Sequence, residues 1–203
     1  MATWLVLGLG NPGPGYAAHR HNIGRLTVAD LASQAGATWK SRRGLRADTA
    51  EVVWPGVAAA GGAAPGPAPA ERVVLATTKT YMNESGLAAA ALLGWLKLRP
   101  DHLVVIHDEI DLDLGRMRLK FGGGDNGHNG LRSIRARLGH GDYYRVRLGV
   151  GRPPGALPVE KWVLTGFPRT DQAVLAEEIE RAASATVSLV TRGLAVTQQD
   201  YNS

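Results

Sequence analysis

Two residues of the chain have the type and setting for acid–base chemistry. His21 lies in a short polar segment, HRHN, ahead of a predicted helix, and histidine titrates near neutral pH, which suits a general base. Asp108 leaves the end of the apolar run 103–109, and sites in α/β proteins form at such strand ends. Asp108 could therefore orient a catalytic histidine. Taken alone, however, a loop histidine of this kind is more often a capping or surface residue.

A metal site is the competing interpretation of the same region. The acids and histidine of the segment HDEIDLD, at 107–113, could bind a divalent cation together with His19 or His21. Successive residues of a strand, such as Asp108 and Glu109, point to opposite faces, which weakens this interpretation. The chain contains no cysteine, which excludes a thiolate zinc site, a disulfide framework and a cysteine nucleophile. We expect a metal-free site.

Three asparagines, Asn11, Asn83 and Asn129, stand where loops meet predicted elements. A neutral amide can bind a carbonyl, a developing oxyanion or a ribose hydroxyl without competing for the proton. Asparagine is also a common cap and turn residue, so Asn83 and Asn129 could instead cap their helices and do nothing more. The sequence leaves both interpretations open.

The segment GLGNPG at 8–13 matches the dinucleotide-binding pattern G-x-G-x-x-G. That pattern requires the loop to open directly into a helix that receives the pyrophosphate. Here prolines and glycines delay the predicted helix to about residue 22, and Asp30 falls inside it. A nucleotide cofactor is therefore disfavoured. The chain also lacks G-x-S-x-G and G-x-x-x-x-G-K-[ST], which removes the main support for a serine hydrolase and a P-loop NTPase.

Basic residues are concentrated in one part of a chain whose net charge is +5. Residues 116–152 contain nine Lys or Arg and two acids, a net charge of +7, which leaves −2 for the remainder. This pattern is typical of a surface that faces phosphates, although a solvated basic face is the ordinary alternative.

Apolar periodicity and the positions of Gly and Pro predict the elements that position these residues. We expect strands at 3–9, 47–54, 71–78, 103–109, 116–121 and 144–151, and helices at 23–35, 84–97, 129–138 and 170–192. Asn22 is expected to cap the first helix, and the Ala/Gly/Pro segment 55–70 to form a flexible surface loop between paired strands. This alternation predicts one α/β domain over 1–203, with a twisted, mixed but mostly parallel sheet and helices on both faces.

The first apolar run is short and follows no basic region, so we interpret it as a strand and not as a signal peptide. No stretch approaches the roughly 18 apolar residues that span a membrane. A cytoplasmic protein without membrane partners is the expectation.

Four segments carry motifs that follow one another along nearly the whole chain: GLGNPGPGYAAHRHNIG at 8–24, KTYMNESG at 79–86, HDEIDLDLGRMRLKFGGG at 107–124 and GHNGLRSI at 127–134. Together they resemble the bacterial peptidyl-tRNA hydrolases. The resemblance implies a cofactor-free, monomeric enzyme that cleaves the ester between a peptide and the terminal ribose of tRNA. A non-catalytic RNA-binding protein on the same fold is the alternative.

The resemblance also implies roles for individual residues. His21 corresponds to the catalytic base and Asp108 to the acid that orients it. Asn11, Asn83 and Asn129 correspond to residues that hold the ester end and the attacking water, Tyr16 and Met82 to the cleft wall, and Lys120 and Arg147 to contacts with tRNA phosphates. Three features differ from the usual family pattern, namely His19, the pair Asp125-Asn126 and the length of the segment 55–70. They bear on RNA affinity and pH profile, because none involves the catalytic pair.

Overall fold

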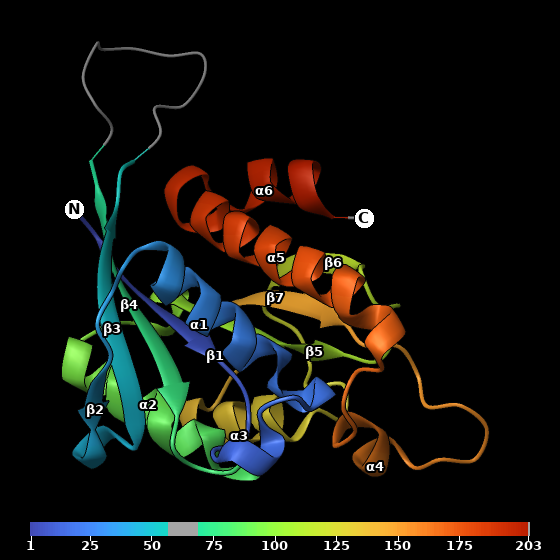
Figure 1. Cartoon of the computed structure of the whole chain (residues 1–203). Coiled ribbons are helices and arrows are strands. Elements are labelled where there is room, and N and C mark those ends of the chain that lie inside the picture. Colours follow the sequence, from blue (N-terminus) through green and yellow to red (C-terminus); the bar gives the residue numbers. More distant parts are fainter. Residues whose placement is uncertain (57–68, 203) are drawn as a thin grey trace.

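A twisted seven-stranded sheet forms the centre of the molecule, seen in a computed structural model that describes residues 1–56 and 69–202 (Figure 1). The strands are β1 (Thr3–Gly8), β2 (Lys40–Arg42), β3 (Ala47–Trp54), β4 (Glu71–Thr78), β5 (Leu103–Glu109), β6 (Met117–Phe121) and β7 (Tyr144–Gly149). Their order in the sheet is β2-β3-β4-β1-β5-β7-β6. The four central strands, β4, β1, β5 and β7, are parallel, and the outer strands pair antiparallel.

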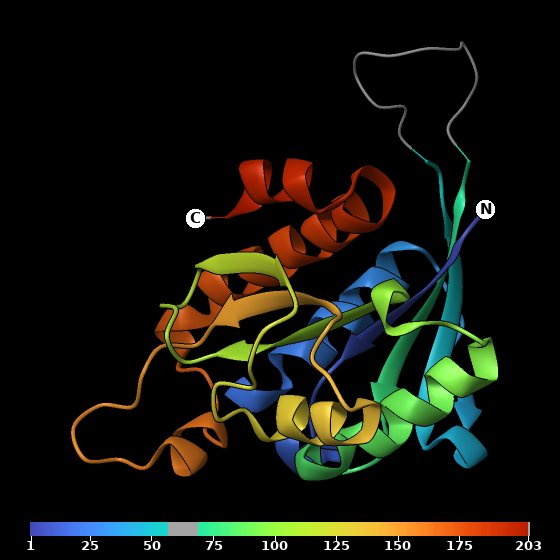
Figure 2. The same ribbon diagram turned by 180° about the vertical axis from the view of Figure 1, so that it is seen from behind.

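Helices cover both faces of this sheet (Figures 1 and 2). One face packs against α1 (Ile23–Gln34) and α5 (Gln172–Arg192), with α6 (Leu194–Tyr201) beside α5. The other face packs against α2 (Ser85–Leu96) and α3 (Asn129–Leu138). Alternate residues of β5 enter the two cores, as expected of a strand that is buried on both sides. The predicted mixed, mostly parallel α/β sheet is confirmed.

Several predicted elements have their expected bounds, including β3, β4, β5 and α3. The sequence did not predict β2, α6 or the five-residue helix α4 (Val159–Val163), which are too short to show a clear period. Helix α2 ends at Leu96, before the predicted end at residue 97, because Lys97 adopts a left-handed conformation with φ of 54°. The predicted loop 55–70 falls largely outside the described residues.

The prediction that Asn22 caps α1 is correct for its position but wrong for its side chain. Asn22 does precede the helix, but its side chain makes no capping hydrogen bond. Its Oδ1 instead accepts the backbone N–H of Asn11 and its Nδ2 donates to the carbonyl of Asn11, both at 2.9 Å. Asn22 therefore ties the loop after β1 to the start of α1.

Two glycines allow backbones to approach closely around the future site. A Cβ at Gly24, in the first turn of α1, would lie 2.1 Å from the carbonyl oxygen of Ile106 in β5. A Cβ at Gly86, in α2, would lie 2.1 Å from the carbonyl oxygen of Ser133 in α3. These contacts bring the residues just ahead of α1 to the end of β5 and hold α2 and α3 together.

No helix in the described part of the chain is long and apolar enough to cross a membrane.

Candidate active site

The structure brings His21 and Asp108 into direct contact at the carboxyl ends of the central strands. His21 lies in the one-turn segment ahead of α1, and Asp108 lies near the end of β5. The Nδ1 atom of His21 is 2.9 Å from both carboxylate oxygens of Asp108. Both side chains are buried. Since an ionised carboxylate only accepts hydrogen bonds, Nδ1 carries the proton and Nε2 keeps its lone pair.

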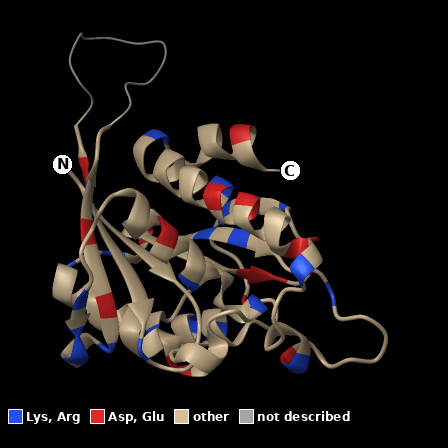
Figure 3. Cartoon of the chain, in the orientation of Figure 1, with Lys and Arg blue, Asp and Glu red and all other residues tan. Residues whose placement is uncertain are grey.

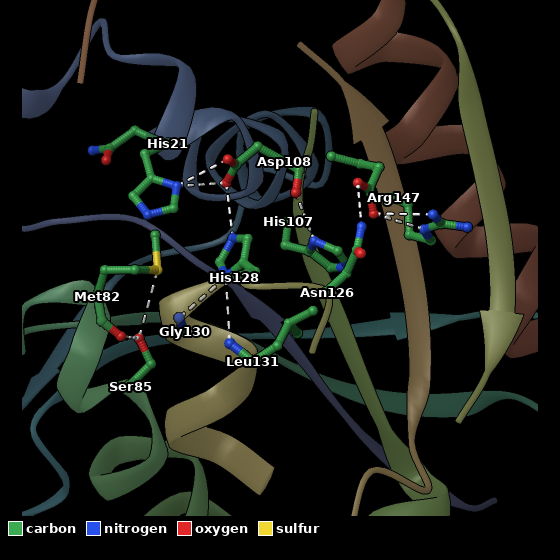
Figure 4. A network of polar contacts seen from close by, with 12 residues as sticks. His21, Met82, Ser85, His107, Asp108, Asn126, His128, Gly130, Leu131 and Arg147 are labelled. Carbon is green, nitrogen blue, oxygen red and sulfur yellow. Dashed lines mark hydrogen bonds and ion pairs between the residues drawn. The ribbon is translucent and has the colours of Figure 1, made fainter. Parts of the chain in front are cut away.

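A third residue, His128, completes this cluster from the opposite side. Its Nε2 is 2.9 Å from Oδ1 of Asp108, and its Nδ1 accepts the backbone N–H groups of Gly130 and Leu131 at the start of α3. Because Nδ1 accepts, Nε2 must carry the proton and donate to Asp108. Figure 4 shows the two histidine rings turned toward Asp108 from different directions. The sequence analysis missed His128, although a polar residue directly before a predicted helix is a signal for a cap.

The charges of the cluster shift the pKa values of Asp108 and His21. Burial alone would raise the pKa of Asp108, but the two facing histidines, His21 and His128, hold it well below its usual range. Burial alone would lower the pKa of His21, but the charge of Asp108 and its hydrogen bond outweigh burial and raise that pKa above its usual value. Asp108 is therefore ionised over the whole physiological range and makes His21 a stronger base.

His107 stands beside the cluster and is kept neutral. Its ring is fully buried, its Nδ1–H donates to the carbonyl of Asp108 at 2.8 Å, and its centroid lies 5.1 Å from that of His128. Burial, with a smaller contribution from His128, lowers the pKa of His107 well below its usual value. A neutral His107 adds no positive charge that would compete with His21 for Asp108.

The loop that carries His21 is fastened to the segment after α4. The backbone N–H of Arg20 donates to the carbonyl of Thr165, and the Arg20 side chain donates to Thr165 Oγ1 at 2.6 Å. Its guanidinium lies 3.7 Å from the ring centroid of Trp162. His19 forms an isolated bridge with Gly166. These contacts place α4 over the cleft and restrict the position of His21.

A continuous cleft runs on both sides of His21. One hollow, of about 390 Å³, is lined by Asp108, His128 and the loop 126–129. A second, of about 700 Å³, is lined by all five residues predicted to bind the substrate: Asn11, Tyr16, Met82, Asn83 and Asn129. The two hollows share His21, Asn129 and Glu160 among their walls. The structure thus gathers all seven residues predicted for catalysis and substrate binding around one cleft.

Asn11 is held in one orientation within this cleft. Its Oδ1 accepts the backbone N–H of Met82 at 2.7 Å, which leaves its amide N–H groups as the donors. Asn83 and Asn129 are exposed near the N-termini of α2 and α3. Neither side chain makes a capping hydrogen bond among the described residues. His128 caps α3 instead. The capping interpretation of these two asparagines is therefore not supported.

The predicted phosphate contacts lie outside the cleft, on the strand pair β6–β7. Lys120 is half-buried, and burial together with the nearby charges of Arg147 and Arg145 lowers its pKa. Arg147 donates through Nε and Nη2 to Oε2 of Glu109, at 3.1 and 3.0 Å. Figure 3 shows the acidic end of β5 beside the two basic positions of β7.

Part of the positive charge of 116–152 has a structural use. Arg145 is buried and donates to the carbonyls of Gly123, Gly124 and Gly141, which closes the glycine-rich loop. Arg152 pairs with Asp111. Asn126, one of the unusual loop residues, donates to Glu109 at 3.1 Å and to Asp111 at 3.0 Å. The acids just before the basic segment therefore offset some of its charge.

One group of side chains among the described residues has the geometry to hold a metal ion: His21, Asp108 and His128, whose donor atoms lie within 4.8 Å of one another. His19, which the metal interpretation of the sequence included, is not part of it; its ring packs edge-on against Tyr16. In this group the two histidine nitrogens already donate to Asp108, so metal binding would have to displace both hydrogen bonds.

Comparison with known proteins gives a consistent result. Residues 5–203 match the family model described as peptidyl-tRNA hydrolase. The chain is 49% identical over 201 residues to a peptidyl-tRNA hydrolase of Cutibacterium acnes, covering 99% of this chain and 98% of the relative. It is 46% identical over 203 residues to one of Streptomyces coelicolor, covering 100% and 96%. A crystal structure of peptidyl-tRNA hydrolase from Acinetobacter baumannii superposes with a TM-score of 0.82 at 32% identity, covering 99% of this chain and 95% of that one.

Proposed function

The chain belongs to the peptidyl-tRNA hydrolase family, as its motifs predicted, and we propose that it hydrolyses the ester between a peptide and the terminal ribose of tRNA through its His21–Asp108 pair. The products are a free peptide and a free tRNA. The observation that carries the assignment of the site is the 2.9 Å contact between His21 Nδ1 and the carboxylate of Asp108, inside a cleft walled by neutral amides. Catalysis in this proposal requires no metal, because an ester is already activated toward water.

His21 is the general base of the reaction. Its Nδ1–H donates to Asp108, so its Nε2 lone pair takes a proton from a water molecule as that water attacks the ester carbonyl. The imidazolium that forms is stabilised by the adjacent carboxylate. His21 then returns the proton to the departing ribose oxygen, which regenerates the neutral base.

Neutral amides stabilise the charge that develops on the carbonyl oxygen. Asn11 is the best-placed donor because Met82 fixes its oxygen and leaves its N–H groups available to the cleft. A single preorganised donor of this kind contributes on the order of 3 kcal/mol in other hydrolases. Asn83 and Asn129 hold the two sides of the ester group, while Tyr16 and Met82 form apolar walls beside it.

His128 positions Asp108 for this chemistry. Its donor bond at 2.9 Å occupies Oδ1 from the α3 side, so Asp108 cannot rotate away from His21. The backbone N–H groups of Gly130 and Leu131 keep the Nε2-protonated form of His128. His128 therefore acts through Asp108 and does not exchange a proton with the substrate.

An N-acetyl-aminoacyl-tRNA is the substrate that tests this proposal. We expect the parent chain to release free tRNA at an undiminished rate after exhaustive chelation, and His21→Ala to abolish release while tRNA affinity stays within a few-fold. Comparable rates for mutant and parent would remove His21 from its role. Loss of activity on chelation, restored by one metal, would favour a metal bound at His21, Asp108 and His128.

Two binding measurements separate the enzyme from its alternatives. A chain that binds tRNA without deacylating it would be a non-catalytic RNA-binding protein on this fold. Saturable enhancement of NADH fluorescence would revive the nucleotide site at GLGNPG. The proposal also includes the phosphate contacts of Lys120 and Arg147. It further includes a cytoplasmic location, a single domain over 1–203 and a monomeric state.

A further inference from the structure

A second basic surface lies at the edge of the sheet opposite Lys120 and Arg147. The stretch KSRRGLR, at 40–46, forms β2 and the following turn and contains four cations and no acid. Lys79 joins it from the end of β4. We call this group, Lys40, Arg42, Arg43, Arg46 and Lys79, the β2 surface. Figure 3 shows it as the blue cluster at the lower left.

Most of its cations form no ion pair within the described residues. Lys79 pairs with Asp48 at 3.0 Å. Lys40, Arg43 and Arg46 are exposed, and no carboxylate of the described chain lies within ion-pair distance of them. The sequence count concealed this cluster, because acids elsewhere bring the net charge outside 116–152 to −2.

The turn that presents these cations is held in place. Leu45 packs into the core beneath α2, and Arg46 adopts φ of 56°, a left-handed conformation uncommon for a side chain of its size. The carbonyl of Arg46 accepts the backbone N–H of Lys79 at 2.7 Å. The surface is therefore a formed part of the fold and not a loose loop.

Exposed indole rings flank the cations. Trp39 precedes β2 and Trp95 lies on α2, and each exposes more than a third of its surface. The Arg42 guanidinium lies 4.9 Å from the ring centroid of Trp95. Cations interleaved with exposed aromatic rings are the composition of surfaces that bind nucleic acid.

The β2 surface lies at the same end of the sheet as the cleft, the end at which the parallel strands have their carboxyl termini. Lys79 directly follows the carboxyl end of β4, and two residues later Tyr81 lines the cleft. Neighbouring strands are about 4.8 Å apart, so β2 and β6, at the two edges of a seven-stranded sheet, are separated by about 29 Å. The cleft lies between two basic surfaces.

We propose that the β2 surface is a second phosphate-contact surface for the RNA of the substrate. The inference rests on the proposed function. A phosphate backbone has a charge at every nucleotide, so a permanent set of unpaired cations gains from it whatever the base sequence. The peptide of the substrate is a less suitable partner, because its charges vary from one substrate to the next.

The test compares two variants that each lose two positive charges. Lys40→Gln/Arg43→Gln changes the β2 surface, while Arg46 is kept because its backbone supports the turn. Arg99→Gln/Arg192→Gln is the control, since both residues are exposed and each pairs with a nearby acid, Asp101 or Asp200. Affinity for deacylated tRNA is measured between about 50 and 200 mM salt, where phosphate contacts dominate. Melting temperatures confirm that both variants fold.

We expect the first variant to reduce the slope of log affinity against log salt by about 1 to 2, with a several-fold rise in KM for N-acetyl-aminoacyl-tRNA and an unchanged kcat. The control keeps the parent's slope. The same ester on a single 3′-terminal nucleoside, which has no phosphate for the β2 surface to contact, is hydrolysed equally by all three proteins.

An unchanged salt slope and affinity in the first variant would overturn the proposal. A selective loss on esters with acidic peptides would then assign the surface to the peptide. Equal slowing on the nucleoside ester would also overturn it, because the substitutions would be acting on the cleft. If the parent hydrolyses neither ester, the proposed function fails, while the tRNA titrations still decide the role of the surface.

Discussion

Asp108→Asn is the substitution that most directly tests the role of the buried carboxylate. Asp108 is buried and accepts hydrogen bonds from His21 Nδ1–H and His128 Nε2–H. An asparagine would keep the volume but present an N–H donor to one of these histidines. To accept that donor, His21 would have to protonate Nε2, the atom that must receive the proton from water.

Two effects follow, and both have a defined size or sign. The wrong tautomer and the loss of imidazolium stabilisation should lower kcat/KM by about 10²- to 10⁴-fold. The pKa of His21 is raised in the parent only because Asp108 outweighs burial. In the variant burial remains, so the pKa of His21 should fall, and the acid limb of the pH–rate profile should move to lower pH.

The assay is release of tRNA from N-acetyl-aminoacyl-tRNA across about pH 5 to 9, with Glu178→Gln as the control because Glu178 is also a buried carboxyl but lies on α5, away from the cleft. The control should keep the parent's rate and profile. A variant that retains activity within a few-fold, or whose acid limb does not move, would refute the view that Asp108 both orients and charges His21.

Three further predictions concern packing, charge and stability. Gly24→Ala should destabilise the fold by about 1 to 3 kcal/mol in urea unfolding and lower kcat, because its Cβ would meet the Ile106 carbonyl; unaltered stability would show that α1 can shift freely. Lys120→Ala should weaken tRNA binding and flatten its salt dependence while leaving kcat intact, and an unchanged salt slope would count against a phosphate contact there. Burial raises the pKa of Glu178 from 4.5 to about 7. The protonated carboxyl therefore contributes fully to the stability of the fold below pH 4.5, and this contribution is lost as pH rises through 7. Glu178→Gln should therefore remove a pH dependence on the order of 3 kcal/mol, and parallel melting curves of parent and variant from pH 5 to 8 would contradict this.

Local patterns in the sequence were sufficient for much of the fold. β3, β4 and β5 have their predicted bounds because short apolar runs bordered by Gly, Pro and charged residues are local signals. The short elements β2, α4 and α6 escaped prediction because a few residues do not establish a period. The same limit applied to Asn22, whose position before α1 was predicted and whose partner, Asn11, was not.

The sequence by itself singled out the residues that we propose carry the chemistry, through the types and order of its motifs: His21, Asp108 and the three asparagines. Only the tertiary structure decided how they meet. β1 and β5 are neighbours in the sheet, and Gly24 lets α1 approach β5, so His21 reaches an acid 87 residues away. The packing of separate elements also brings His128 to Asp108 and Arg147 to Glu109. Such contacts depend on the direction and distance of side chains from separate elements, which no local pattern specifies.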